Sequence, residues 1–193
     1  MIEKEAITAV ILAGGQSRRM GQNKALLRLG GQSFLERVVA AASPLVTAVA
    51  LVDNGTVAAH YKGVSWSDRY LGQGPVAGIE TALWHIKTPY ALILSCDLPV
   101  LSTAVLGHLL AHSNAQKSTI FSLEGRWQPL IGVYAQTQQA IFEQALQQQQ
   151  LRLMDVLQEL PVEVCPCPKQ WATHLSNVNT LEAYQRLQHD FEH

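Results

Sequence analysis

The strongest constraint on this chain is the alternation of short apolar runs with segments of helical spacing. Glycine or aspartate follows within two residues of the apolar, β-branched runs at 7–12, 47–52 and 90–96, a pattern typical of buried strands. Segments with helical spacing come after them, at about 34–42, 75–86 and 102–113. This order predicts an α/β domain with a mostly parallel sheet and right-handed crossovers.

Local signals refine this prediction. The run at 90–96 is almost entirely apolar, as expected for a central strand that has parallel neighbours and is buried on both faces. Ser33 and Glu36 match a capping box, which predicts that a helix begins there. A weaker strand is predicted at 25–29. Further strands are expected near 64 and at 118–123, 128–134 and 162–167, and further helices at 137–150, 151–157 and 180–188.

Size and charge exclude several classes of protein. The 193 residues suffice for one domain, 1–193, with a full core. Only 15% of residues are charged and the net charge is −1, which argues against binding to nucleic acid or a membrane surface. No run approaches the ~18 apolar residues of a membrane span. The N-terminus carries acids where a signal peptide needs basic residues, so a cytoplasmic protein is expected.

Cysteine and histidine spacing offers little metal or disulfide chemistry by itself. Three cysteines, Cys96, Cys165 and Cys167, are too few and too unevenly spaced for a disulfide framework, and Cys165-x-Cys167 lacks the second pair of a zinc site. His108 and His112 lie four residues apart on a predicted helix with no third ligand near them in the sequence. The sequence favours structural roles for both groups.

The loop after the first predicted strand concentrates cations and glycines. Residues 10–27 read "VILAGGQSRRMGQNKALL". Glycine N–H groups can face phosphate oxygens, and Arg18, Arg19 and Lys24 add positive charge beside them. The spacing of Gly14, Gly15 and Gly21 matches neither the Walker pattern G-x-x-x-x-G-K-[ST] nor the dinucleotide-binding pattern G-x-G-x-x-G. The loop therefore predicts a polyphosphate site of another kind, with a glycine-rich turn and solvated cations as the alternative.

Ligands on such sheets bind at the carboxyl ends of the strands. The segments "AGGQSRRMGQNK", "DNG" and "DLP", which follow the predicted strands at 7–12, 47–52 and 90–96, are therefore expected to converge on one cleft.

Five motifs in order resemble the molybdenum cofactor guanylyltransferases, a group of nucleotidyltransferases. They are "LAGGQSRRMGQNK", "GPVAGI", "CDLP", "QPLIGVY" and "NVNT", spread from residue 12 to residue 180. The resemblance implies a three-layer α/β/α nucleotidyltransferase fold with a mixed, mostly parallel sheet. It also implies transfer of GMP from GTP to molybdopterin cofactor with release of pyrophosphate. Proteins that deliver molybdopterin or handle the apoenzymes are possible partners. Asn23 departs from the family, which often has an acid there.

The same resemblance assigns residue roles. Arg19 and Lys24 would hold the triphosphate, and Asp97 would bind Mg²⁺, for which one carboxylate with phosphates and waters suffices. Contacts to the nucleotide are implied for Asp68 and for backbone atoms of Leu12, Ala13 and Gly14. Asn177 and Asn179 would contact the second substrate. The base contact is left between Asp53 and Asn54.

Each assignment has a plainer alternative. Asp97 could cap the helix that follows it, although Ser102 fits that role better. Asp68 could be a surface acid, and Asn177 and Asn179 could form a turn and a helix cap. The rival functions are transfer of CMP to the same cofactor, a sugar-phosphate nucleotidylyltransferase, and a nucleotide-binding regulator without chemistry. The "LAGG" and "NVNT" motifs and the short chain speak against the first two.

Overall fold

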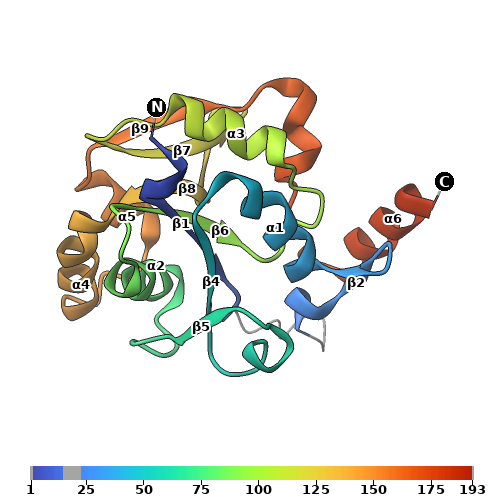
Figure 1. Cartoon of the computed structure of the whole chain (residues 1–193), viewed down its shortest axis with the longest axis horizontal. Coiled ribbons are helices and arrows are strands. Elements are labelled where there is room, and N and C mark those ends of the chain that lie inside the picture. The colour runs from blue at the N-terminus through green and yellow to red at the C-terminus, as the bar shows by residue number, and fades with distance from the viewer. Residues whose placement is uncertain (1, 15–22, 193) are drawn as a thin grey trace.

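A mixed sheet of seven strands forms the centre of the described chain (Figure 1). The structure is a computed structural model that describes residues 2–14 and 23–192. The strand order is β5-β4-β1-β6-β8-β7-β9, and β2 and β3 form a separate hairpin. The bounds are β1 Ile7–Leu12, β2 Arg28–Leu29, β3 Gln32–Ser33, β4 Ala48–Asp53, β5 Val64–Ser67, β6 Tyr90–Ser95, β7 Ser118–Leu123, β8 Arg126–Ala135 and β9 Val162–Pro166.

Two halves of the sheet differ in strand direction. β5, β4, β1 and β6 are parallel to one another, whereas β8 is antiparallel to both β6 and β7. β6 is therefore central, but the expectation of parallel neighbours on both sides of it was wrong. Glu124 and Gly125, with φ of 50° and 77°, make a tight turn that joins β7 and β8 as a hairpin. β8 returns from this turn into the place between β7 and β6 and runs opposite to both.

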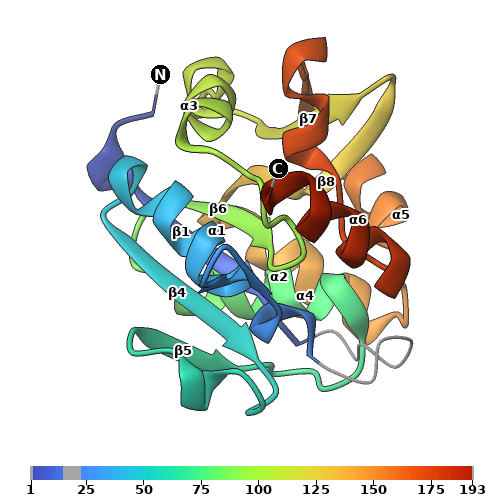
Figure 2. The same ribbon diagram turned by 90° about the vertical axis from the view of Figure 1, so that its right-hand side faces the viewer.

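Helices cover both faces of the sheet, as the three-layer prediction requires (Figures 1 and 2). Residues of α1 and α3 share one core with Leu92 and Leu94 of β6, and residues of α2, α4 and α5 share another with Ala91 and Ile93. Alternate β6 residues thus enter opposite cores, which explains the apolar run. The helices are α1 Phe34–Ala42, α2 Gly74–His85, α3 Thr103–His112, α4 Gln139–Gln147, α5 Leu153–Gln158 and α6 Leu181–Glu192. Within the described chain, none of the helices has the length and apolar character needed to cross a membrane.

The segment predicted as a strand at 25–29 was the main local error. Lys24–Leu26 forms the 3₁₀ helix η2, and only Arg28–Leu29 is strand. The side-chain oxygen of Asn23 accepts a hydrogen bond from the Ala25 N–H at 3.0 Å, which favours the helical turn. The other 3₁₀ helices are η1 Lys4–Ala6, η3 Ser43–Leu45, η4 Ala58–His60, η5 Gln136–Gln138 and η6 Lys169–Leu175.

The C-terminal helix packs on the β2–β3 hairpin, far from it in the sequence (Figure 1). The Tyr184 ring meets Phe34 edge-on with centroids 5.8 Å apart, and its hydroxyl donates to the Arg28 carbonyl at 2.7 Å. The predicted capping box at the start of α1 is confirmed, because Ser33 and Glu36 exchange both hydrogen bonds. This packing brings the segment before α6 to Asp97, just after the end of β6.

Candidate active site

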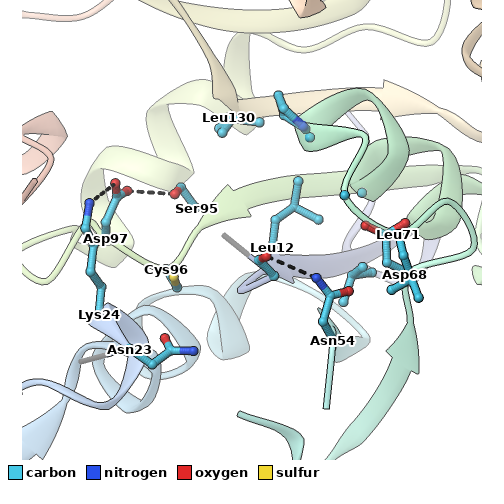
Figure 3. A pocket seen from close by; sticks show the side chains of 16 residues that line it. Leu12, Asn23, Lys24, Asn54, Asp68, Leu71, Ser95, Cys96, Asp97 and Leu130 are labelled. Atoms are coloured by element: carbon cyan, nitrogen blue, oxygen red, sulfur yellow. Dashed lines mark hydrogen bonds and ion pairs between the residues drawn. The ribbon is translucent and has the colours of Figure 1, made fainter. Parts of the chain in front are cut away.

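A cavity of about 1000 Å³ lies at the carboxyl ends of the parallel strands (Figure 3). Residues from all three predicted segments line it, so the expected convergence is confirmed. The lining residues are Leu12, Gly14, Asn23, Lys24, Val52, Asn54, Asp68, Leu71, Gly72, Gly74, Pro75, Gly78, Ser95, Cys96, Asp97 and Leu130.

One wall carries Lys24 and Asp97, and Asn179, which is not among the lining residues, completes a polar cluster with them. The Lys24 ammonium donates to the side-chain oxygen of Asn179 and lies 4.0 Å from Asp97 Oδ2. The Ser95 hydroxyl donates to Asp97 Oδ1 at 2.6 Å, as Figure 3 shows. The cluster therefore holds a carboxylate and an ammonium side by side at the mouth of the cleft.

The main chain holds the Asn177–Asn179 segment against this wall. The Val178 N–H donates to the Asp97 carbonyl oxygen at 3.0 Å, and the Val178 side chain is buried beside Phe34. Asn177, on the other side of Val178, is exposed. The Thr180 hydroxyl accepts from the Ala183 N–H at 3.1 Å, so Thr180 provides the side-chain cap of α6 that the alternative assigned to the asparagines.

Asp97 also does not cap the helix that follows it. The cap of α3 is Ser102, whose hydroxyl accepts from the Val105 N–H at 3.4 Å. The carboxylate of Asp97 is instead held by Ser95 and faces Lys24. This carboxylate is a suitable ligand for a hard cation such as Mg²⁺, which takes one or two protein oxygens and completes its shell with phosphates and waters.

The opposite wall is built from β1, β4 and the loop before α2. The Asn54 amide donates to the Gly14 carbonyl at 3.1 Å, and both residues line the cavity. Asp53 is 2% exposed, and its Oδ2 accepts from the Val57 and Ala58 N–H groups at 2.6 and 2.9 Å. Of the two residues that the sequence left open, Asn54 is therefore the one that faces the cavity.

The three residues at the end of β1 are placed differently. Leu12 and Gly14 line the cavity, whereas Ala13 is 2% exposed and is not among the lining residues. The Ala13 N–H donates to the Val52 carbonyl at 2.9 Å, which continues the β1–β4 ladder by one residue. Ala13 thus positions its two neighbours.

Asp68 lines the same wall and is not a plain surface acid. Its Oδ1 accepts from the Tyr70 N–H at 3.0 Å and from the Thr81 hydroxyl at 3.4 Å. Burial raises the pKa of this carboxyl group, and the two hydrogen bonds oppose the rise. Asp68 is therefore a preorganised hydrogen-bond acceptor.

Cys96 lies between the two walls and is chemically inert there. Burial raises the pKa of its thiol to about 12, so the sulfur stays protonated at neutral pH and is a poor nucleophile. Its main-chain N–H donates to the Leu12 carbonyl at 3.4 Å. Packing is the role that these contacts support.

Some lining residues were missed from the sequence and one predicted residue is not described. Ser95, Leu71, Gly72 and Leu130 were not singled out as site residues, although Ser95 precedes Asp97 by the two-residue spacing that brings their side chains together. Arg19, with Arg18, lies outside the described residues.

Comparison with known proteins gives the family. Residues 9–164 match the model of the MobA-like NTP transferase domain. A probable molybdenum cofactor guanylyltransferase from Flavobacterium johnsoniae is 33% identical over 95% of this chain and 97% of its own. One from Carboxydothermus hydrogenoformans is 35% identical over 94% of each chain. The crystal structure of molybdopterin-guanine dinucleotide biosynthesis protein A from Archaeoglobus fulgidus aligns over 95% of this chain and 97% of its own, with a TM-score of 0.80 and 24% identity. The chain is therefore a nucleotidyltransferase and belongs to the MobA-like NTP transferase family, which includes these guanylyltransferases.

Proposed function

We propose that this nucleotidyltransferase transfers GMP from GTP to molybdopterin cofactor and thereby forms the guanine dinucleotide cofactor and pyrophosphate. The observation that carries the proposal is the Lys24–Asp97–Asn179 cluster on one wall of a large cleft. The names of the guanylyltransferases at 33% and 35% identity support the choice of substrates.

In the proposed reaction an oxygen of the molybdopterin phosphate bonds to the α-phosphorus of GTP. The bond from that phosphorus to the bridging oxygen breaks, and pyrophosphate leaves with the electron pair. Both reactants are anions, so the protein must orient them and neutralise charge. Lys24 supplies a compact positive charge for the phosphates, and Arg19 is proposed to supply a second one.

The opposite wall, with Asn54, Asp68 and the end of β1, is proposed to hold the nucleoside. The base and ribose are proposed to contact backbone atoms of Leu12 and Gly14. They are also proposed to contact the Asn54 amide, which donates a hydrogen bond to the Gly14 carbonyl. The Asp68 carboxylate accepts hydrogen bonds from the nucleotide. Asn179, which belongs to the cluster, and Asn177, two residues before it, are proposed to contact the second substrate, because an amide can both donate and accept.

We propose Mg²⁺ as the divalent cation that this enzyme uses. Asp97 would hold it, with Ser95 orienting the carboxylate. When bound, the cation would neutralise charge on the phosphate oxygens. Lys24 and Asp97 stand 4.0 Å apart between ammonium nitrogen and Oδ2, so both can contact one triphosphate.

We further propose that residues 1–193 act as one catalytic domain. The matched family model stops at residue 164, yet the side-chain oxygen of Asn179 accepts a hydrogen bond from the Lys24 ammonium, so the C-terminal segment belongs to the site. A cytoplasmic location and exchange of cofactor with delivering or apoenzyme-handling proteins complete the proposal.

The test is incubation of the purified protein with Mg²⁺, molybdopterin cofactor and GTP, CTP or ATP in separate reactions. GTP is expected to give the dinucleotide product and pyrophosphate in preference to CTP and ATP. Equal or better use of CTP would overturn the guanylyl assignment, and no product from any of the three nucleotides would favour a binding protein without chemistry.

A further inference from the structure

Three metal-ligating side chains that are separated in the sequence meet outside the cavity. The ligand atoms of His108, His112 and Cys165 all lie within 4.8 Å of one another. The histidines come from α3, and the cysteine comes from β9, the strand at the edge of the sheet. None of the three lines the cavity at the strand ends. The third ligand that the histidine spacing lacked in the sequence is therefore supplied by the fold.

We propose that His108, His112 and Cys165 form a binding site for a zinc-like transition-metal ion. Two imidazoles and a thiolate are nitrogen and sulfur ligands, which favour Zn²⁺ over Mg²⁺ or Ca²⁺. In a tetrahedral zinc site, two nitrogen ligands and one sulfur ligand lie about 3.3 to 3.6 Å apart. The observed cluster, whose ligand atoms lie within 4.8 Å of one another, is about 1 Å wider than this, so binding of one ion is expected to draw the side chains inward. The fourth position is left for water.

The histidine tautomer suits this role. His112 Nδ1 lies 2.8 Å from the His108 carbonyl oxygen, and a carbonyl can only accept, so Nδ1 carries the proton. The lone pair is then on Nε2, the atom left to bind metal, and a backbone carbonyl on the other ring nitrogen is the usual support of a metal-bound histidine. Burial, followed by the charge of His112, lowers the pKa of His108, which favours the neutral ring over the charged one.

Aromatic packing holds the cluster in place. The His108 ring is parallel to Phe121, with an interplanar angle of 4°, and meets Trp171 edge-on at a centroid distance of 5.1 Å. Phe121 of β7 is in register with Cys165 of β9, so the same sheet edge fixes both the imidazole and the sulfur. The His108 and His112 ring centroids are 4.2 Å apart.

Metal binding at this site must release a proton. Burial, with smaller contributions from Cys167 and Glu163, raises the pKa of the Cys165 thiol to about 11. The thiol is therefore protonated without metal, and the metal–sulfur bond forms as the S–H proton passes to water.

The test is titration of the chelator-treated full chain with Co²⁺, followed by absorption spectroscopy. One equivalent of Co²⁺ is expected to give a thiolate-to-cobalt charge-transfer band. Zn²⁺ is expected to displace the Co²⁺ and abolish the band. Cys165→Ser and His112→Ala should lose the band or weaken Co²⁺ binding at least tenfold. His112 is exposed, so its replacement leaves the core intact, and circular dichroism checks the fold of each variant.

Matched controls make the outcome decisive. Cys167→Ser removes a thiol two residues away whose sulfur donates to the Pro168 carbonyl, and His60→Ala removes an exposed histidine of η4; both should keep the band. No band in the wild-type protein would overturn the proposal. A band that survives Cys165→Ser, or that disappears in Cys167→Ser, would place the thiolate elsewhere and overturn it as well.

Discussion

The two walls of the cleft each present an aspartate, and the two carboxylates have different surroundings. Asp97 accepts from Ser95 and lies 4.0 Å from the Lys24 ammonium. Asp68 accepts from the Tyr70 N–H and the Thr81 hydroxyl, and burial raises its pKa. Arg69 follows Asp68 in the sequence, and its guanidinium forms ion pairs with Glu80 and Glu143. The Arg69 Cζ atom lies 3.8 Å from the centroid of the Trp84 ring.

This difference assigns different chemistry to the same residue type. A carboxylate beside an ammonium and a hydroxyl is suited to a site where phosphate and metal charges are balanced. The Asp68 carboxylate is half-buried and accepts hydrogen bonds from a backbone N–H and a hydroxyl. Such a carboxylate is suited to accepting one more hydrogen bond from a neutral group of a ligand. The wall with Lys24 and Asp97 should therefore control turnover as well as triphosphate binding, whereas the wall with Asp68 and Asn54 should affect mainly nucleotide affinity.

The largest expected effect is that of Asp97→Asn, which keeps the shape and removes the charge. Turnover with GTP should fall by about 10² or more, on the scale of about 3 kcal/mol for one electrostatic stabiliser. The melting temperature should change little or rise, because functional carboxylates in a cleft add little to stability. Steady-state kinetics and thermal melting measure the two effects.

The matched control for Asp97 is Ser102→Ala. It removes the α3 cap and should cost about 1 kcal/mol of unfolding free energy with turnover nearly intact. An active Asp97→Asn enzyme would show that this carboxylate does not act on the phosphates or their metal.

The second effect is that of Lys24→Ala, which should weaken GTP binding about ten- to a hundredfold by removing a charged hydrogen-bond donor. Lys24→Arg should recover only part of the loss, because a planar guanidinium does not replace a compact ammonium. Titration with GTP measures this, with the exposed Lys62→Ala as a charge-matched control. Wild-type affinity in Lys24→Ala would remove the polyphosphate role.

The third effect is that of Asp68→Asn, which should weaken GTP binding about tenfold, the loss of one hydrogen bond to a charged acceptor, with a smaller change in kcat. A larger change in kcat than in affinity would remove the contrast between the walls.

The same variant tests the pKa of Asp68 through stability. A raised pKa means that the folded chain binds the proton more tightly than the unfolded chain, so stability is lost as the pH rises above the ordinary value of 3.8. Asp68→Asn should therefore melt at the same or a higher temperature than wild type at about pH 7, and its advantage should shrink toward about pH 4. An advantage that grows on acidification would contradict the raised pKa.

The smallest effect is that of Asn54→Ala, which removes the amide that donates to the Gly14 carbonyl. About fivefold weaker GTP binding is expected, the equivalent of about 1 kcal/mol for one partly exposed hydrogen bond. Isothermal titration measures it. Asp53→Ala is the contrasting variant: it should lower the melting temperature, because the Val57 and Ala58 N–H groups lose their acceptor.

Much of this site could be predicted from the sequence because its parts lie in the segments that connect strands to the elements after them. Lys24 and Asp97 come after the apolar runs that became β1 and β6, and parallel strands present their carboxyl ends at one edge. The choice between Asp53 and Asn54 could not be made in this way, because adjacent residues of a strand end face opposite sides. Only the fold gives Asp53 the buried N–H donors of Val57 and Ala58.

The sequence by itself determined the apolar runs, the Ser33–Glu36 cap and the five motifs, because these depend on residue type and short spacing. The tertiary structure decided what distant segments do to one another. It inserted β8 antiparallel between β6 and β7, brought Asn179 to Lys24 across 155 residues, and placed Cys165 beside His108 and His112. Such contacts form because burying two apolar faces fixes which strands and helices pack together, and no local pattern encodes that choice.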